Sequence, residues 1–153
     1  MSTLIVVLPP EPPGAATPLE YLLTQDGRTV TVHDRAVASL LPAARETLAL
    51  VPAALLSWHR VELPKGSLGR GASPRLRAML EGLLEDRLLD EPAELHFALP
   101  PDAKAQAPLW VAACNRAWLR AGLALLESTR RPAARIVPEL APGPAQIHLI
   151  GDP

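Results

Sequence analysis

Cysteine is nearly absent from this chain of 153 residues, and the single one is Cys114. One cysteine cannot close an internal disulfide, so folding must depend on a hydrophobic core, and such usage is typical of a reducing compartment. The histidines are His33, His59, His96 and His148. They fall in separate segments without the spacing of metal ligands, so the sequence predicts no metal site.

Aromatic residues make up only 3% of the chain, and the formal net charge is −1. A nucleic-acid-binding surface needs basic residues and stacking platforms, so no nucleic-acid partner is expected. Long apolar runs are also missing, because runs such as residues 48–56 fall far short of the roughly 20 residues that span a bilayer. No basic region precedes the short apolar run near the N-terminus, which argues against a secretory signal. These residues are therefore expected to be soluble and cytoplasmic.

The motifs that usually identify enzymes are missing too. No Gly-x-Ser-x-Gly elbow of a serine hydrolase occurs. The glycines of residues 66–71 have the spacing G-x-x-G-x-G, which is not the dinucleotide order, and no Gly-Lys-Ser/Thr follows them. This segment favours a solvated loop, with an incidental anion site as the alternative because basic residues lie nearby. We therefore assign no catalytic, cofactor-binding or metal-binding residue, and no cofactor.

Hydrophobic residues, by contrast, make up 48% of the chain, enough for a sizeable core. The clearest helical pattern covers residues 73–89, where Ser73 can cap the first turn and Pro74 needs no backbone N–H. Glu91-Pro92 ends this helix, because the residue before a proline is disfavoured in the α region. The apolar stripe is Leu76, Met79, Leu80, Leu83 and Leu84. This periodicity predicts an amphipathic helix that packs the stripe on a sheet including residues 94–99.

Acidic residues occupy much of the opposite side of this helix. They include Glu81, Glu85 and Asp86. Carboxylates on an exposed helix face are usually only solvated, and the alternative is a surface that docks a partner. We take these three residues as the candidate partner-binding site.

Short strands account for most of the remaining pattern. Strands are expected at residues 4–8, 19–24, 28–33, 47–51, 56–63, 94–99, 109–114, 135–138 and 146–150. An Asp26-Gly27 pair between two of them predicts a hairpin. Further helices are expected at residues 36–44 and at 116–130, the latter capped by Asn115. The first third thus follows the order β-β-β-α-β, and residues 56–138 follow β-α-β-β-α-β, the order of a ferredoxin-like unit.

Four stretches, in this order and spacing, resemble a known family. They are Leu-Ala-Leu-Val-Pro-Ala at 48–53, Arg-Val-Glu-Leu-Pro at 60–64, the block from Leu-Glu-Asp-Arg-Leu at 84–88 through Glu-Leu-His-Phe-Ala-Leu at 94–99, and Arg-Ile-Val-Pro-Glu at 135–139. The chain is similar to the N-terminal cytoplasmic domain of the L protein of bacterial type II secretion systems (the GspL family). That family is related to the pilus-assembly M protein and to the cell-division protein FtsA.

The resemblance implies an α/β (α+β) fold that combines part of an actin-like ATPase or RNase H-like subdomain with the ferredoxin-like unit. Residues 1–55 would form the first part of the actin-like subdomain, and 56–138 the βαββαβ unit. Residues 139–153 would be a linker and the first strand of a truncated second half. In a full family member a second half, a transmembrane helix and a periplasmic domain follow, so a full-length parent would be a single-pass membrane protein.

The family also implies a function that the composition alone does not. The chain would be a non-catalytic scaffold on the cytoplasmic side of the inner membrane, where it docks the N-terminal domain of the secretion ATPase and meets other inner-membrane platform proteins. An unpaired final strand at 146–150 also makes a homodimer an expectation. Two alternatives stay open, namely a degenerate actin-like nucleotide-binding protein or hydrolase, and an unrelated ferredoxin-like protein-binding module.

The first of these alternatives yields a prediction, because an actin-type ATPase needs an Asp-x-Gly turn after its first strand. Here the strand is followed by Pro-Pro-Glu-Pro-Pro at residues 9–13, and prolines have no N–H to offer a phosphate. We therefore predict no measurable release of phosphate from Mg-ATP by the purified chain. Turnover that survives stringent purification and disappears on changing one residue of this chain would contradict the prediction.

Overall fold

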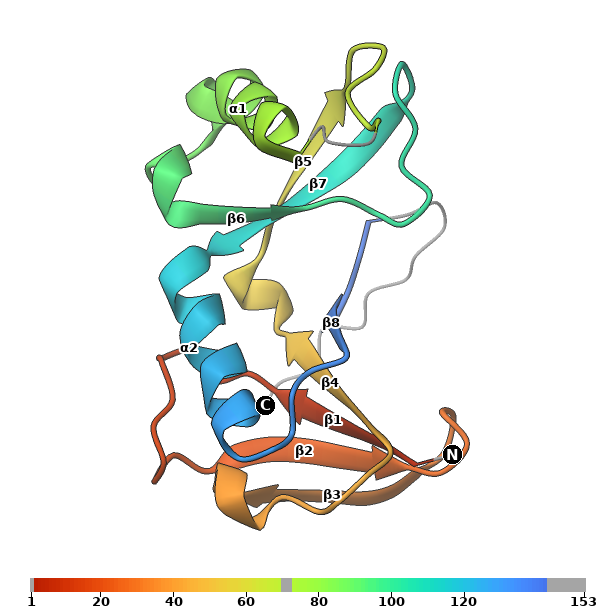
Figure 1. The fold of residues 1–153 in the computed structure, drawn as a ribbon, viewed down its shortest axis with the longest axis vertical. Coiled ribbons are helices and arrows are strands. Elements are labelled where there is room, and N and C mark those ends of the chain that lie inside the picture. Colours follow the sequence, from red (N-terminus) through yellow and green to blue (C-terminus); the bar gives the residue numbers. More distant parts are fainter. Residues whose placement is uncertain (1, 70–72, 143–153) are drawn as a thin grey trace.

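A computed structural model describes residues 2–69 and 73–142 (Figure 1). Its strands are β1 (Thr3–Val7), β2 (Leu19–Thr24), β3 (Val30–Ala36), β4 (Glu46–Val51), β5 (Ser57–Glu62), β6 (Leu95–Ala98), β7 (Pro108–Asn115) and β8 (Arg135–Pro138). The helices are α1 (Ser73–Leu84) and α2 (Arg116–Ser128), with 3-10 turns η1 (Ala38–Leu40), η2 (Ala53–Leu55), η3 (Glu85–Arg87) and η4 (Pro92–Glu94). Each strand predicted between residues 4 and 138 is present, and the strand expected at 146–150 lies outside the described residues.

The larger sheet has five strands in the order β3-β2-β1-β4-β8. Strands β1, β2 and β3 form an antiparallel meander, whereas β1 pairs with β4 and β4 with β8 in parallel. The predicted hairpin is confirmed by the antiparallel pairing of β2 with β3, and Gly27 in its turn has a φ of 74°, which glycine adopts without strain. The Asp26 carboxylate accepts hydrogen bonds from the backbone N–H groups of Thr29 and Arg28, which lower its pKa to about 2.

The smaller sheet has three antiparallel strands in the order β5-β7-β6, and α1 covers one of its faces (Figure 1). Helix α2 starts where β7 ends and runs along the larger sheet. The Asn115 side chain accepts a hydrogen bond from the backbone N–H of Trp118 at 2.9 Å, which confirms the predicted cap. Each sheet is thus covered by one of the two described α-helices.

The expected ferredoxin-like unit does not form as predicted. Its first four elements are present as β5, α1, β6 and β7, but the last strand, β8, pairs with β4 of the other sheet. The register is parallel, and Leu48 lies opposite Arg135. The physical reason is that α2 packs on the larger sheet, so the chain that follows it returns to that sheet's edge. The fold class is mixed α/β, as expected, but the smaller sheet has only three strands.

Two hydrophobic cores hold these layers together. In the first, Leu4, Val6 and Leu8 of the segment that begins with β1 pack against Trp118 and Leu126 of α2. Gly122 allows this close approach, because a Cβ atom there would lie 3.0 Å from a methyl carbon of Leu8. The second core lies between α1 and the smaller sheet, and its buried residues are Val61, Leu63, Leu80, Leu84, Leu109 and Val111.

Two predicted helices are shorter than expected. Residues 36–44 contain only the 3-10 turn η1, consistent with Pro42 interrupting the segment. The helix expected over 73–89 ends at Leu84 and continues as η3, so Glu85 and Asp86 lie beyond its α-helical part. None of the described helices combines the length and the apolar composition that crossing a bilayer requires.

The leucine stripe of α1 packs on the smaller sheet as predicted, but Leu83 does not belong to the buried part. Leu84 is 0% exposed, whereas Leu83 is 42% exposed and lies beside the outer edge of β5. A sheet of three strands is too narrow to cover a stripe of five apolar residues, so the residue at its margin faces solvent. The expectation that Leu83 packs on the sheet with the rest of the stripe is therefore wrong.

The structure instead predicts that Leu84→Ala lowers the free energy of unfolding by about 2–5 kcal/mol, because it leaves a cavity in the second core. Leu83→Ala is the matched control and should cost less than about 1 kcal/mol. Urea denaturation followed by circular dichroism measures both values. Equal losses for the two variants would show that the helix is rotated about its axis relative to this structure.

Candidate interaction surface

The three candidate partner-binding residues, Glu81, Glu85 and Asp86, differ in their surroundings. Glu81 is half-buried on α1, while Glu85 and Asp86 are exposed in η3. The sequence predicted all three on one exposed face of a helix, whereas the structure has one half-buried carboxylate on α1 and two exposed carboxylates in the turn that follows it.

Glu81 belongs to a network that attaches α1 to the smaller sheet. Its carboxylate lies 3.0 Å from Nε of Arg77, one turn earlier on the helix. Nη2 of Arg77 donates to the backbone carbonyl oxygens of Pro92 at 3.1 Å and Leu95 at 2.9 Å, and the guanidinium lies 5.3 Å from the ring centroid of Phe97. Glu81 thus pairs with an arginine that itself attaches α1 to the smaller sheet.

Glu85 and Asp86, by contrast, form no ion pair in the described part of the chain. Their neighbour Arg87 donates from Nη1 to the carbonyl oxygen of Arg60 at 2.7 Å, which fixes η3 against the edge strand β5. Leu89, three residues beyond Asp86, is fully exposed. The carboxylates of Glu85 and Asp86 are therefore unpaired within the described residues, and the exposed side chain of Leu89 follows them in the chain.

A shallow pocket of about 290 Å³ adjoins this turn on the side of β5. It is lined by Arg60, Val61, Glu62, Leu83, Arg87 and Pro108. We name Glu85, Asp86, Leu83 and Leu89 the acidic surface; the pocket beside it carries two arginines, Arg60 and Arg87, and is not part of it. Sequence reasoning missed Leu83 and Leu89 as surface residues, because helical periodicity assigned Leu83 to the core and gave no role to Leu89.

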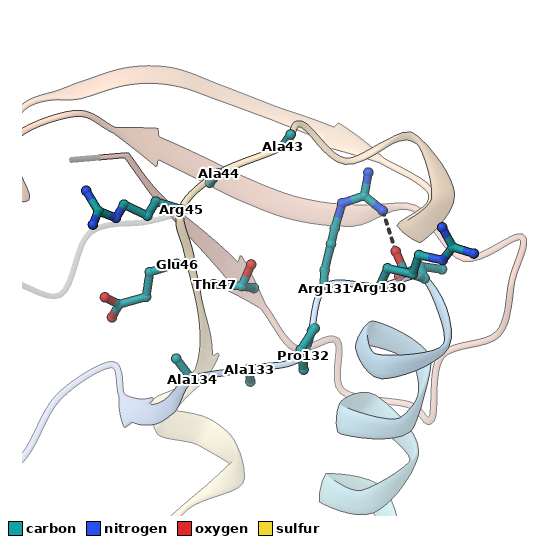
Figure 2. Close-up of a pocket in the computed structure, with 11 residues that line it drawn as sticks. Ala43, Ala44, Arg45, Glu46, Thr47, Arg130, Arg131, Pro132, Ala133 and Ala134 are labelled. Atoms are coloured by element: carbon teal, nitrogen blue, oxygen red, sulfur yellow. Dashed lines mark hydrogen bonds between the residues drawn. The ribbon is translucent and has the colours of Figure 1, made fainter.

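A larger cleft of about 740 Å³ lies at the amino-terminal ends of β4 and β8, between residues 43–47 and 129–134 (Figure 2). Arg131 spans it and donates to the carbonyl oxygens of Thr129 and Leu41, so this side chain joins the end of α2 to the loop before β4. Figure 2 shows Arg45 and Arg130 pointing to opposite sides. Ligands of open α/β sheets bind at the carboxyl ends of strands, and the charged groups here do not converge, so this cleft is a structural junction.

The segment after β1, where an actin-type phosphate loop would lie, is used for packing. The backbone N–H of Leu8 donates to the carbonyl oxygen of Leu50 at 3.0 Å, and Nε1 of Trp118 donates to the carbonyl oxygen of Pro9 at 2.7 Å. This segment is therefore held against β4 and α2 by its own backbone, and its prolines offer no donors.

Cys114 and the described histidines occupy different environments. Cys114 is buried in the first core, and burial raises the pKa of its thiol to about 11, so it remains a protonated thiol at neutral pH. Desolvation lowers the pKa of His59, with the nearby Arg87 as a second cause. Desolvation also lowers the pKa of His96, followed by the charges of Arg116, Arg77 and Arg120. Within the described residues no group of His, Cys, Asp and Glu side chains could hold a metal ion.

Comparison with protein families gives a match that covers most of the chain. A family described as "Type II secretion system (T2SS), protein L" matches residues 20–148. No individual curated protein matches the chain.

Among solved structures, the chain is similar to the cytoplasmic domain of EpsL, an inner membrane component of the type II secretion system of Vibrio cholerae, with a TM-score of 0.66 and 24% identity. The match covers 90% of this chain and 57% of that one, so this chain spans little more than half of that structure's length. The PilM–PilN type IV pilus biogenesis complex follows, with a TM-score of 0.47, 15% identity, and coverage of 90% and 46%. A Bacteroides thetaiotaomicron protein with an actin-like ATPase fold has a TM-score of 0.44, 8% identity, and coverage of 89% and 51%.

The lowered pKa values of His59 and His96 predict a pH dependence of stability. Because the unfolded chain binds a proton at these sites more readily than the folded one, stability is fully present above about pH 6.5 and declines as the pH falls through the lowered folded values. The double variant His59→Gln/His96→Gln should show a shallower decline between about pH 6.5 and 5 in urea denaturation. His33→Gln is the control. If His33→Gln makes the decline shallower and the double variant does not, the loss of stability at low pH does not come from His59 and His96.

Proposed function

Because the chain belongs to the type II secretion system protein L family, we propose that it acts as a non-catalytic scaffold of the inner-membrane secretion platform and docks the cytoplasmic secretion ATPase. The observation that carries the proposal is the family match over residues 20–148. The proline-rich segment after β1 supports a non-catalytic role, because it packs against α2 where a nucleotide-binding member of the fold would cradle phosphate. The resemblance found in the sequence is therefore confirmed at the level of the family.

The proposed location is the cytoplasmic side of the bacterial inner membrane. It is supported by the similarity in fold to EpsL, whose solved domain is cytoplasmic and whose parent is an inner-membrane component. A full-length parent with a single membrane span is part of the same proposal, as are contacts with other platform proteins. Pairing with a second copy of the chain stays a prediction.

The acidic surface is the proposed docking site for the N-terminal domain of the secretion ATPase. Two properties support this choice. Glu85 and Asp86 are exposed and free of ion pairs within the described residues, and Leu89 and Leu83 supply exposed apolar area beside them. A partner with basic residues around an apolar contact would complement this surface in charge and in polarity. Glu81 supports the surface from within by holding Arg77, and it is not expected to contact the partner.

The test is binding of the cognate ATPase N-terminal domain to the double charge reversal Glu85→Lys/Asp86→Lys. We expect the association rate to fall about tenfold at low ionic strength and the difference to shrink in about 0.5 M salt, because charges at an exposed surface act over roughly 10 Å. Stopped-flow fluorescence gives the rate. The melting temperature should stay within about 2 °C of the wild-type value, because neither side chain contacts the core.

The matched control is Glu11→Lys/Glu127→Lys, which makes the same change of charge at exposed positions away from η3. Equal effects of the two double variants would mean that only net charge matters and that the acidic surface is merely solvated. No binding by the wild-type chain in either salt would refute docking of the ATPase altogether. Glu81 is left unchanged, because its reversal would break the ion pair with Arg77 and confuse binding with stability.

A further inference from the structure

The amino-terminal end of α2 carries a cationic cluster of opposite sign to the acidic surface. Arg116 is the first residue of the helix, Arg120 lies one turn later on the same side, and the first turn contains no acidic residue. Neither arginine forms an ion pair or a side-chain hydrogen bond within the described residues, and Arg120 is exposed. Both charges are therefore available to a ligand.

This arrangement departs from two rules of helix stability. The amino-terminal end of a helix carries a partial positive charge, so acidic residues are favoured there and Arg116 is unfavourable. Like charges four residues apart also repel each other across one turn. Where a sequence departs from local rules without a stabilising contact, the site is a candidate for function.

The smaller sheet brings a neutral imidazole to the same place, so the positive charge there comes from the arginines. His96 of β6 lies opposite Cys114 of β7, one residue before the cap of α2. The charged groups that act on the His96 ring are all arginines, namely Arg116 and Arg120 of α2 and Arg77 of α1. Within the described residues, Arg77 pairs with the carboxylate of Glu81, whereas Arg116 and Arg120 pair with none. The junction of β6 and α2 is thus a region of unbalanced positive charge in a chain whose net charge is −1.

We propose that Arg116 and Arg120, beside His96, form a docking surface for an acidic segment of a partner polypeptide. Charge complementarity identifies the occupant, because two free guanidinium groups one turn apart match carboxylates on an extended or helical acidic segment. The chain lacks the broad basic surface and the aromatic platforms that binding of nucleic acid requires. The surface is separate from the acidic surface on η3 and opposite in sign, so the inference does not rest on the docking site of the ATPase.

The experiment measures binding of a fluorescein-labelled 12-residue peptide of alternating glutamate and serine to the full chain by fluorescence anisotropy in about 50 mM salt. We expect Arg116→Gln/Arg120→Gln to bind about tenfold more weakly than wild type. The matched control, Arg28→Gln/Arg35→Gln on the β2–β3 hairpin, removes the same charge at exposed positions and should bind as wild type does. Equal weakening in both variants, or no binding by wild type, overturns the proposal.

Two further measurements separate the proposal from its competitors. The melting temperature of Arg116→Gln/Arg120→Gln should equal or exceed that of wild type, because unfavourable charges are removed, and a clear decrease would show that the arginines are structural. A single-stranded RNA 12-mer and vesicles of phosphatidylglycerol serve as competing probes. If either binds more tightly than the peptide through the same two arginines, the assignment to an acidic polypeptide is wrong.

Discussion

The structure depends on the junction at Asn115, where a strand of one sheet becomes the helix that covers the other. No linker separates β7 from α2, so the direction of the helix is set by the cap, in which the Asn115 side chain binds the N–H of Trp118. Cys114 and Trp118, on either side of this cap, are both buried in the first core. The relative placement of the two sheets is therefore fixed by the five residues 114–118 and by the hydrogen bond from Trp118 to Pro9.

Local features of the sequence predicted most elements of the fold. The Asp26-Gly27 turn, the Asn115 cap and the alternation of polar and apolar residues in β5 and β6 each depend on a few neighbouring residues, and the turn, the cap and both strands are present. The position of β8 depends instead on where α2 packs, which no local pattern contains. A parallel partner distant in sequence cannot be derived from periodicity, so β8 was assigned to the wrong sheet.

In the candidate sites, too, local sequence patterns do not show which side chains contact distant parts of the chain. The sequence predicted Glu81, Glu85 and Asp86 on one face of a helix, but only the geometry of Arg77 shows that Glu81 forms an ion pair while Glu85, beyond the end of α1, forms none in the described part of the chain. The exposure of Leu83 depends on the width of a sheet that the sequence does not reveal. The cluster of Arg116 and Arg120 did have a local signal, since a helix that begins with arginine and lacks acidic residues in its first turn can be recognised without coordinates.

The return of β8 to the edge of β4 also has a consequence for the order of folding. Strands β5, β6 and β7 with α1 form a continuous stretch of chain inserted between β4 and β8, and their pairings close shorter loops than the pairing of β4 with β8 does. Pairing of Leu48 with Arg135 closes a long loop, yet the entropic cost of closure grows only by about 0.6 kcal/mol for each doubling of loop length. The inserted sheet can therefore assemble early and shorten the search for the parallel pair, which makes β8 the natural last step of folding.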